Sequence, residues 1–183
     1  MTRGGPAQLP QRVGRFCEAE GLLPRGCHVL VAFSGGPDSL ALLRLLVTMA
    51  AERGLRVSAL HLDHGLRPES GAEASWALTL AAELGVDCQR QRLGGLCLAQ
   101  GNLEERARVA RRRALEAHAE ALGADRIALG HHADDQAETV LLRLLRGAGP
   151  RGLGAMAPRQ GIWIRPLLSC RRGELEAYLE AQG

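Results

Sequence analysis

The sequence contains no lysine, and all 23 of its basic residues are arginine. This absence excludes a Walker-type phosphate loop, because that loop places a lysine ammonium on the phosphates. It also excludes Schiff-base chemistry, which needs a lysine amine. Any phosphate bound by this chain must therefore be held by backbone amides, hydroxyl groups, arginine or a metal ion.

Paired cysteines and long apolar runs are also missing. The five cysteines, at positions 17, 27, 88, 97 and 170, form no C-x-x-C pair, a pattern typical of reduced thiols in the cytosol rather than of a zinc site or a disulfide framework. The longest apolar run, residues 40–51, is broken by Arg44 and is too short to cross a bilayer. Residues 1–26 lack the apolar stretch of a signal peptide. We therefore expect a cytoplasmic protein that does not enter a membrane.

Aromatic residues make up only 3% of the chain, so the core must consist largely of leucine, alanine and valine. The hydrophobic share of 46% is ample for such a core, and 183 residues fit a single domain. A net charge of +3 is too small to indicate a nucleic-acid partner by itself.

Short apolar runs alternate with longer helical patterns along the chain. The pattern predicts strands at 28–33, 57–62, 86–93, 126–129 and 162–164, and helices at 40–53, 72–84, 103–122, 134–146 and from about 171. Such alternation predicts an α/β fold, a Rossmann-like parallel sheet of about five strands with helices on both faces. We assign residues 1–25 to a leader segment with a short amphipathic helix, and residues 26–183 to the nucleotide-binding domain.

The segment S-G-G-P-D-S lies between the first predicted strand and the helix that follows it. Its glycines allow a sharp turn that brings backbone N–H groups close to an anion, and the helix dipole favours a phosphate there. Asp38 would repel a phosphate unless it held Mg²⁺. The alternative is an ordinary helix start, with aspartate and serine as capping groups. The predicted ATP ligands are Ser34, Gly35, Gly36, Pro37, Asp38 (also the Mg²⁺ ligand) and Ser39.

This loop resembles the PP-loop of the ATP-pyrophosphatase superfamily, whose members split ATP into AMP and pyrophosphate. Three further segments resemble the tRNA(Ile)-lysidine synthase family: H-L-D-H-G-L-R at 61–67, N-L-E-E-R-A-R-V-A-R at 102–111, and G-H-H-A-D-D-Q-A-E-T at 130–139, which R-G-A-G-P-R-G-L-G-A-M follows at 146–156. With R-P-L-L at 165–168, the resemblance covers residues 28 to about 179 in the family's order.

The resemblance implies an ATP-dependent carbon–nitrogen ligase. In the family, the C2 carbonyl oxygen of the wobble cytidine in a CAU-anticodon tRNA(Ile) attacks the α-phosphate of ATP, and pyrophosphate leaves. The amine of free lysine then attacks C2 and expels AMP, giving lysidine. The implied cofactors are ATP and Mg²⁺, the implied partners are tRNA(Ile) and lysine, and a homodimer is compatible with the family. The family's C-terminal tRNA-binding parts are expected to be absent from this chain.

Several residues outside the loop are candidates for the site. Arg108 and Arg111 share a helix face with Glu104 and could neutralise phosphate, whereas Arg106, Arg112 and Arg113 are expected to form a solvated basic face. His131 and Asp135 are predicted to act in catalysis with Arg111, and Asp63, followed by His64, to contact the nucleotide. Alternatively, His131, His132, Asp134 and Asp135 could bind a transition metal, or Asp134 could cap a helix.

Two other functions remain open at this stage. One is a thiolase-type PP-loop enzyme that modifies tRNA, although those enzymes typically carry C-x-x-C pairs. The other is a truncated ATP-binding module without activity. The intact motif residues favour a catalytic domain over an inactive module.

Overall fold

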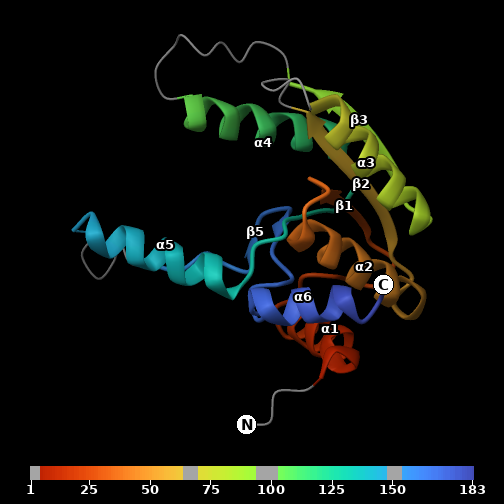
Figure 1. Ribbon diagram of the computed structural model, residues 1–183, viewed down its shortest axis with the longest axis horizontal. Helices are drawn as coiled ribbons and strands as arrows, with labels where there is room; N and C mark the ends of the chain where they lie inside the picture. The colour runs from red at the N-terminus through yellow and green to blue at the C-terminus, as the bar shows by residue number, and fades with distance from the viewer. Residues whose placement is uncertain (1–4, 64–69, 94–102, 148–153) are drawn as a thin grey trace.

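The computed structural model describes residues 5–63, 70–93, 103–147 and 154–183 (Figure 1). Strands and helices alternate through most of this part of the chain, as the sequence pattern predicts. The elements are η1 (Pro6–Gln8), α1 (Leu9–Ala19), β1 (His28–Ala32), α2 (Pro37–Arg53), β2 (Arg56–Asp63), α3 (Ser70–Glu83), β3 (Asp87–Arg92), α4 (Leu103–Leu122), β4 (Arg126–Ala128), α5 (Ala133–Leu145), β5 (Arg159–Gln160), β6 (Trp163–Ile164) and α6 (Arg172–Glu180).

The strands form one six-stranded sheet in the order β3-β2-β1-β4-β6-β5. β1 lies near its centre, where Leu30 pairs with Ser58 of β2 and with Ile127 of β4. All pairings are parallel except that of β5 with β6. The predicted α/β class and parallel sheet are therefore confirmed, with one short antiparallel edge strand in addition.

Helices cover both faces of the sheet. Val29 and Val31 of β1 point into a large core cluster with the leucines of α2 and with residues of α1, α3 and α6. Leu30, between them, points to the other face, where a smaller cluster contains Leu115 of α4. This alternation is the ordinary consequence of a pleated strand buried on both sides.

The helix in the predicted leader segment shares the main core. Leu9, Val13 and Cys17 of α1 are all buried in the cluster that contains the α2 leucines. Arg12 of the same helix forms an ion pair of 2.8 Å with Glu174 of α6. Residues 9–19 are therefore packed as an integral layer of the described fold.

Helix α5 stands apart from these layers and extends away from the sheet (Figure 1). None of its residues is buried, and four of its leucines are exposed. Near its first turn, the Gln136 side-chain amide makes two hydrogen bonds to the backbone of Met156, of 2.9 and 2.6 Å. These bonds tie the base of α5 to the segment that returns toward β5. Within the described residues, no helix is both long enough and apolar enough to cross a membrane.

Candidate functional site

The loop between β1 and α2 is closed by its two serines. The Ser39 hydroxyl donates to the Gly36 carbonyl at 2.9 Å and accepts the Ser34 N–H at 3.3 Å. The two serine hydroxyl oxygens lie 3.0 Å apart, and the Ser34 hydroxyl also accepts the Gly36 N–H at 3.3 Å. This network of side-chain hydrogen bonds holds the loop around the start of α2.

The start of α2 presents backbone donors rather than a capping side chain. Gly36 is the N-cap residue, Pro37 follows it in the first turn, and no side chain caps the helix. The first N–H groups of any helix lack intrahelical acceptors, and the helix dipole adds partial positive charge to them. The arrangement therefore suits an anion better than it suits the alternative of a self-capped helix.

Glycine is required at the second position of the loop. Gly35 has a φ of +81°, and a Cβ atom built on it would lie 3.1 Å from the Cβ of Ala77 on α3. Both the backbone conformation and the close approach of α3 therefore disfavour any side chain there. The loop is held between the sheet and α3 as well as by its own hydrogen bonds.

The turn between β4 and α5 packs directly on the first turn of α2. A Cβ atom on Gly130 would lie 3.3 Å from the carbonyl carbon and oxygen of Asp38 and from the nitrogen of Ser39. These are backbone atoms that cannot rotate away. The absence of a side chain at Gly130 is what allows the two turns to meet, a role that was not predicted from the sequence.

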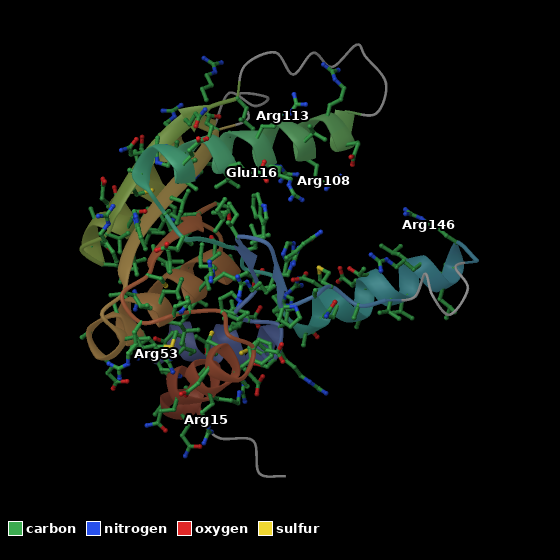
Figure 2. All side chains as sticks on the ribbon, turned by 180° about the vertical axis from the view of Figure 1, so that it is seen from behind. Arg15, Arg53, Arg108, Arg113, Glu116 and Arg146 are labelled. Carbon is green, nitrogen blue, oxygen red and sulfur yellow. The ribbon has the colours of Figure 1, made fainter. Side chains whose placement is uncertain are left out.

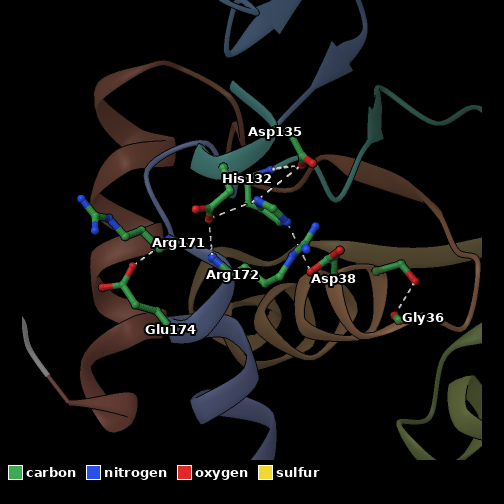
Figure 3. Close-up of polar contacts among 9 residues, drawn as sticks. Gly36, Asp38, His132, Asp135, Arg171, Arg172 and Glu174 are labelled. Carbon is green, nitrogen blue, oxygen red and sulfur yellow. Dashed lines mark hydrogen bonds and ion pairs between the residues drawn. The ribbon is translucent and has the colours of Figure 1, made fainter. Parts of the chain in front are cut away.

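His132 connects the carboxylates of these two turns (Figure 3). Its side chain is fully buried, and its Nε2 atom lies 3.5 Å from Asp38 Oδ1. Its Nδ1 atom lies 3.5 Å from Asp135 Oδ2 and 3.6 Å from Asp134 Oδ2. Asp135 also accepts the His132 backbone N–H at 2.8 Å, which fixes the start of α5.

Asp134 is tied to α6 instead of to the loop. Its carboxylate accepts the backbone N–H of Arg172 at 2.7 Å, and this hydrogen bond is the main reason why the pKa of Asp134 is lowered. Asp134 thus joins the start of α5 to α6, whereas Asp135 bonds the backbone of His132 within the first turn of α5 itself. The alternative in which Asp134 caps a helix is compatible with this contact, because Arg172 is the first residue of α6.

His131, the predicted catalytic histidine, does not share the position of His132. The backbone at His132 is extended (φ −123°, ψ −176°), so neighbouring side chains leave on opposite sides. Burial and the nearby charge of Arg165 lower the pKa of His131. Within the described residues, no hydrogen bond or ion pair joins His131 to Asp135. The structure brings Asp38 and Asp135 together through His132, with His131 beside them.

The predicted arginines of α4 lie on the surface. Arg108 is exposed and makes a two-pronged ion pair with Glu105, with N–O distances of 2.7 and 2.6 Å. Arg111 is exposed as well. Figure 2 shows Arg108 on the same side of α4 as Glu116, with Arg113 pointing away. The side chain of Glu104 lies outside the described residues.

Arg112 was expected to belong to a solvated basic face, and its side chain is indeed 45% exposed, but it also makes contacts that the sequence did not predict. Its guanidinium lies 5.0 Å from the centre of the Trp163 ring, and its Nε atom is 3.1 Å from Glu116 Oε1. The Trp163 indole N–H donates to the same carboxylate oxygen at 3.1 Å. Arg112 therefore joins α4 to β6 while it stays in contact with solvent, because an arginine can stack on an indole and pair with a carboxylate at the same time.

Asp63, predicted to contact the nucleotide, ends β2 with a buried side chain. Its carboxylate pairs with Arg90 of β3 at 2.5 Å, and its backbone carbonyl accepts the Leu93 N–H at 2.8 Å. Asp63 therefore joins two strand ends, and a nucleotide contact by this residue stays a prediction. His64 lies outside the described residues.

A metal site is not preformed in the part of the chain that the structure describes. No group of three or more His, Cys, Asp and Glu side chains there could hold a metal ion. The cluster of His131, His132, Asp134 and Asp135 is thus not arranged as a transition-metal site. Single carboxylates such as Asp38 still match the way in which Mg²⁺ binds, through one or two carboxylates, water and substrate phosphates.

The lowered pKa of His131 gives a testable pH dependence of stability. Because the pKa in the folded state lies below the value of about 6.5 for an unfolded chain, protonation favours unfolding. His131 should therefore cost no stability above that value and should destabilise the fold as the pH falls below it. The free energy of unfolding in urea is measured at pH 7.5 and at pH 5.5. Between these two values it should fall less in His131→Gln than in the wild type, and the difference should be a fraction of the roughly 1.4 kcal/mol that one pKa unit represents. Equal losses in both proteins would contradict this assignment.

Comparisons with known proteins place the chain in a family. A family model described as a PP-loop domain matches residues 9–183. The tRNA(Ile)-lysidine synthase of Symbiobacterium thermophilum is 45% identical over 182 residues, which cover 96% of this chain and 38% of that protein. The tRNA(Ile)-lysidine synthase of Nitratidesulfovibrio vulgaris is also 45% identical over 182 residues, 96% of this chain and 52% of that protein. The chain therefore spans about half or less of the length of these two relatives.

Solved structures share the fold at low sequence identity. The U34-tRNA thiolase NcsA of Methanococcus maripaludis superposes with a TM-score of 0.81 at 20% identity, over 97% of this chain and 63% of that one. The NH3-dependent NAD synthetase of Campylobacter jejuni superposes with a TM-score of 0.63 at 18% identity, over 98% and 74%. Because the family model takes in β1, the loop after it and all the strand ends around that loop, the chain belongs to the family of ATP-binding PP-loop domains.

Proposed function

We propose that this chain is the catalytic domain of a tRNA(Ile)-lysidine synthase. It would join lysine to C2 of the wobble cytidine of CAU-anticodon tRNA(Ile) through an adenylated cytidine, releasing pyrophosphate and AMP. Two relatives that carry this name are 45% identical to it across 96% of its length. The proposal extends their activity to this chain, which spans only part of each.

The proposal rests mainly on one observation: the start of α2, which suits an anion, lies next to the carboxylates of Asp38 and Asp135. The first turn of α2 offers backbone donors for a phosphate, and Asp38 in that turn is linked through His132 to Asp135 of α5. Asp38 would hold Mg²⁺, which neutralises charge on a triphosphate when bound. The start of α2, which would bind the triphosphate of ATP, therefore lies in direct contact with the β4–α5 turn, which would receive the cytidine.

The remaining roles follow from charge and protonation. With its lowered pKa, His131 is neutral at pH 7 and can donate or accept a hydrogen bond beside the reacting base. Asp135 holds the start of α5 in place and, with Arg111, would position the cytidine and the α-phosphate. Arg108 is bound to Glu105 and would have to leave it in order to contact a phosphate.

The thiolase alternative has a structural argument against it as well as the missing C-x-x-C pair. Burial raises the pKa of Cys17 to about 12 and that of Cys88 to about 11. The pKa of Cys27 and that of Cys170 are raised for the same reason. Thiols in this state are poor nucleophiles and poor ligands for iron, because the thiolate is the reactive form. Cys97 lies outside the described residues.

The direct test is to incubate the chain with ATP, Mg²⁺, labelled lysine and an unmodified transcript of CAU-anticodon tRNA(Ile). We expect lysine to become attached to the RNA only when ATP is present. A methionine tRNA transcript, which shares the CAU anticodon, serves as the control and should accept none. A chain that binds ATP but attaches no lysine would contradict the proposal, and mass spectrometry of the transcript after incubation with a sulfur donor would then test the thiolase alternative.

A further inference from the structure

Arg165 lies at the functional edge of the sheet but has no role in the activity described so far. It follows β6 directly, and β6 pairs with β4, whose end carries His131. Its Nη1 atom donates to the Ala157 carbonyl at 2.8 Å. Its Nε atom is buried without a hydrogen-bond partner, and no carboxylate of the described residues forms an ion pair with it.

The surroundings of Arg165 are positively charged. Trp163 lies two residues earlier in the same extended segment, so both side chains leave on the face covered by α4. Arg112 stacks on that indole, and its charge, together with burial, lowers the pKa of Arg165. Among the described residues, the carboxylate in this contact is that of Glu116, which Arg112 and Trp163 already share. The described residues thus give this half-buried guanidinium no counter-charge of its own, and an anionic ligand would supply one.

The position of Arg165 indicates which anion it would receive. In the sheet, β6 is separated by β4 from β1, whose end carries the PP-loop. Neighbouring strands lie about 4.8 Å apart, so the end of β6, where Arg165 lies, is roughly 10 Å to one side of the start of α2. A triphosphate held at that helix start would lie beside Asp38, whereas a longer polyanion could extend along the strand ends past His131 to Arg165.

We infer that Arg165, flanked by Arg112 and His131, binds a backbone phosphate of the RNA strand next to the reacting nucleotide. This inference rests on the proposed function, since it assumes an RNA substrate. Arginine suits this task because its planar group stays charged when half buried and binds phosphate through two N–H groups.

The test measures how tightly the chain binds an unmodified tRNA(Ile) transcript over a range of salt concentrations. Removing one phosphate contact should lower the slope of log K against log salt by about 0.7 to 0.9. Arg165→Gln should therefore bind about tenfold more weakly with this smaller slope, whereas Arg165→Lys should keep the wild-type slope. ATP affinity should stay unchanged in both variants.

Arg159 provides the matched control. It lies on β5 opposite Ile164, whose side chain belongs to the other face of the sheet, and its own side chain donates to the nearby Gly161 carbonyl at 3.2 Å. Arg159→Gln should therefore change neither affinity nor slope. Thermal melting of each variant shows whether the fold survives. If Arg165→Gln does not fold, Arg165→Met, which keeps the length of the side chain without its charge, takes its place and should show the same loss of slope.

The outcomes separate this inference from the proposed function. If the wild type attaches lysine to RNA but Arg165→Gln keeps the wild-type salt slope, this inference is overturned and the proposed function stands. Weakened ATP binding with an unchanged salt slope would also overturn it, by assigning Arg165 to the triphosphate. A wild-type chain that binds no tRNA would overturn both.

Discussion

Replacing Asp38 with asparagine should lower the rate of pyrophosphate release by at least about 10³-fold, equivalent to about 4 kcal/mol of transition-state stabilisation. The substitution keeps the size and shape of the side chain but removes the charge that would hold Mg²⁺. It also removes the carboxylate that lies 3.5 Å from His132. The side chain is 36% exposed, so the fold should tolerate the change.

The measurement is the rate of pyrophosphate release from ATP with the tRNA transcript present. Asp87→Asn is the matched control, because Asp87 is an exposed aspartate on the edge strand β3, away from the loop. It should retain the wild-type rate. If Asp38→Asn retained more than about one tenth of the wild-type rate, with the same melting temperature, Asp38 could not be the metal-binding carboxylate.

Gly130→Ala should reduce the same rate by about 10²-fold through geometry alone. The added methyl group would lie 3.3 Å from the backbone of Asp38 and Ser39, so one of the two turns must shift by a few tenths of an ångström. Such a shift alters the contact between Asp38 and His132, and small displacements of positioned groups can cost about 10²-fold in rate. The stability of the fold should fall by about 1 to 3 kcal/mol, as is usual for overpacking.

Gly173→Ala is the matched control for this substitution. Gly173 has no atom within 4 Å of an added Cβ and has an ordinary backbone conformation. It lies in the first turn of α6, where alanine is neutral or slightly stabilising. If both glycine variants kept the wild-type rate, the close approach of the β4–α5 turn to α2 would not matter for activity.

Most of the fold could be predicted because its signals are local. The apolar runs of β1, β2 and β4 and the helix-length patterns between them predicted the order of these elements. The helices predicted at 40–53, 72–84, 103–122 and 134–146 are each followed by a glycine (Gly54, Gly85, Gly123 and Gly147), and all four glycines have positive φ in the structure. The short strand β5 was missed, because Arg159 and Gln160 are exposed and carry no apolar pattern.

The site was less predictable, because its contacts depend on how separate elements pack. The loop after β1 was recognisable from its sequence, since each residue has a local role. The sequence could not show which of two adjacent histidines faces Asp38. That choice depends on the register of β4 against β1 and on the close packing at Gly130. The position of Arg112 over Trp163 likewise depends on α4 packing on β6, 51 residues further along the chain.

The two turns that meet at His132 belong to helices of very different local stability. The loop leads into α2, whose leucines at 42, 43, 45 and 46 are completely buried, so that this helix should open only when the whole domain unfolds. Helix α5 has no buried residue, and among the described residues it is held by its first turn and by side-chain hydrogen bonds of Gln136 to Met156 and of Arg143 to Gly154. Such a helix can fray on its own at low free-energy cost. Part of the binding energy of a substrate that contacts both turns would then be spent on ordering α5, which lowers its apparent affinity while leaving the loop itself unchanged.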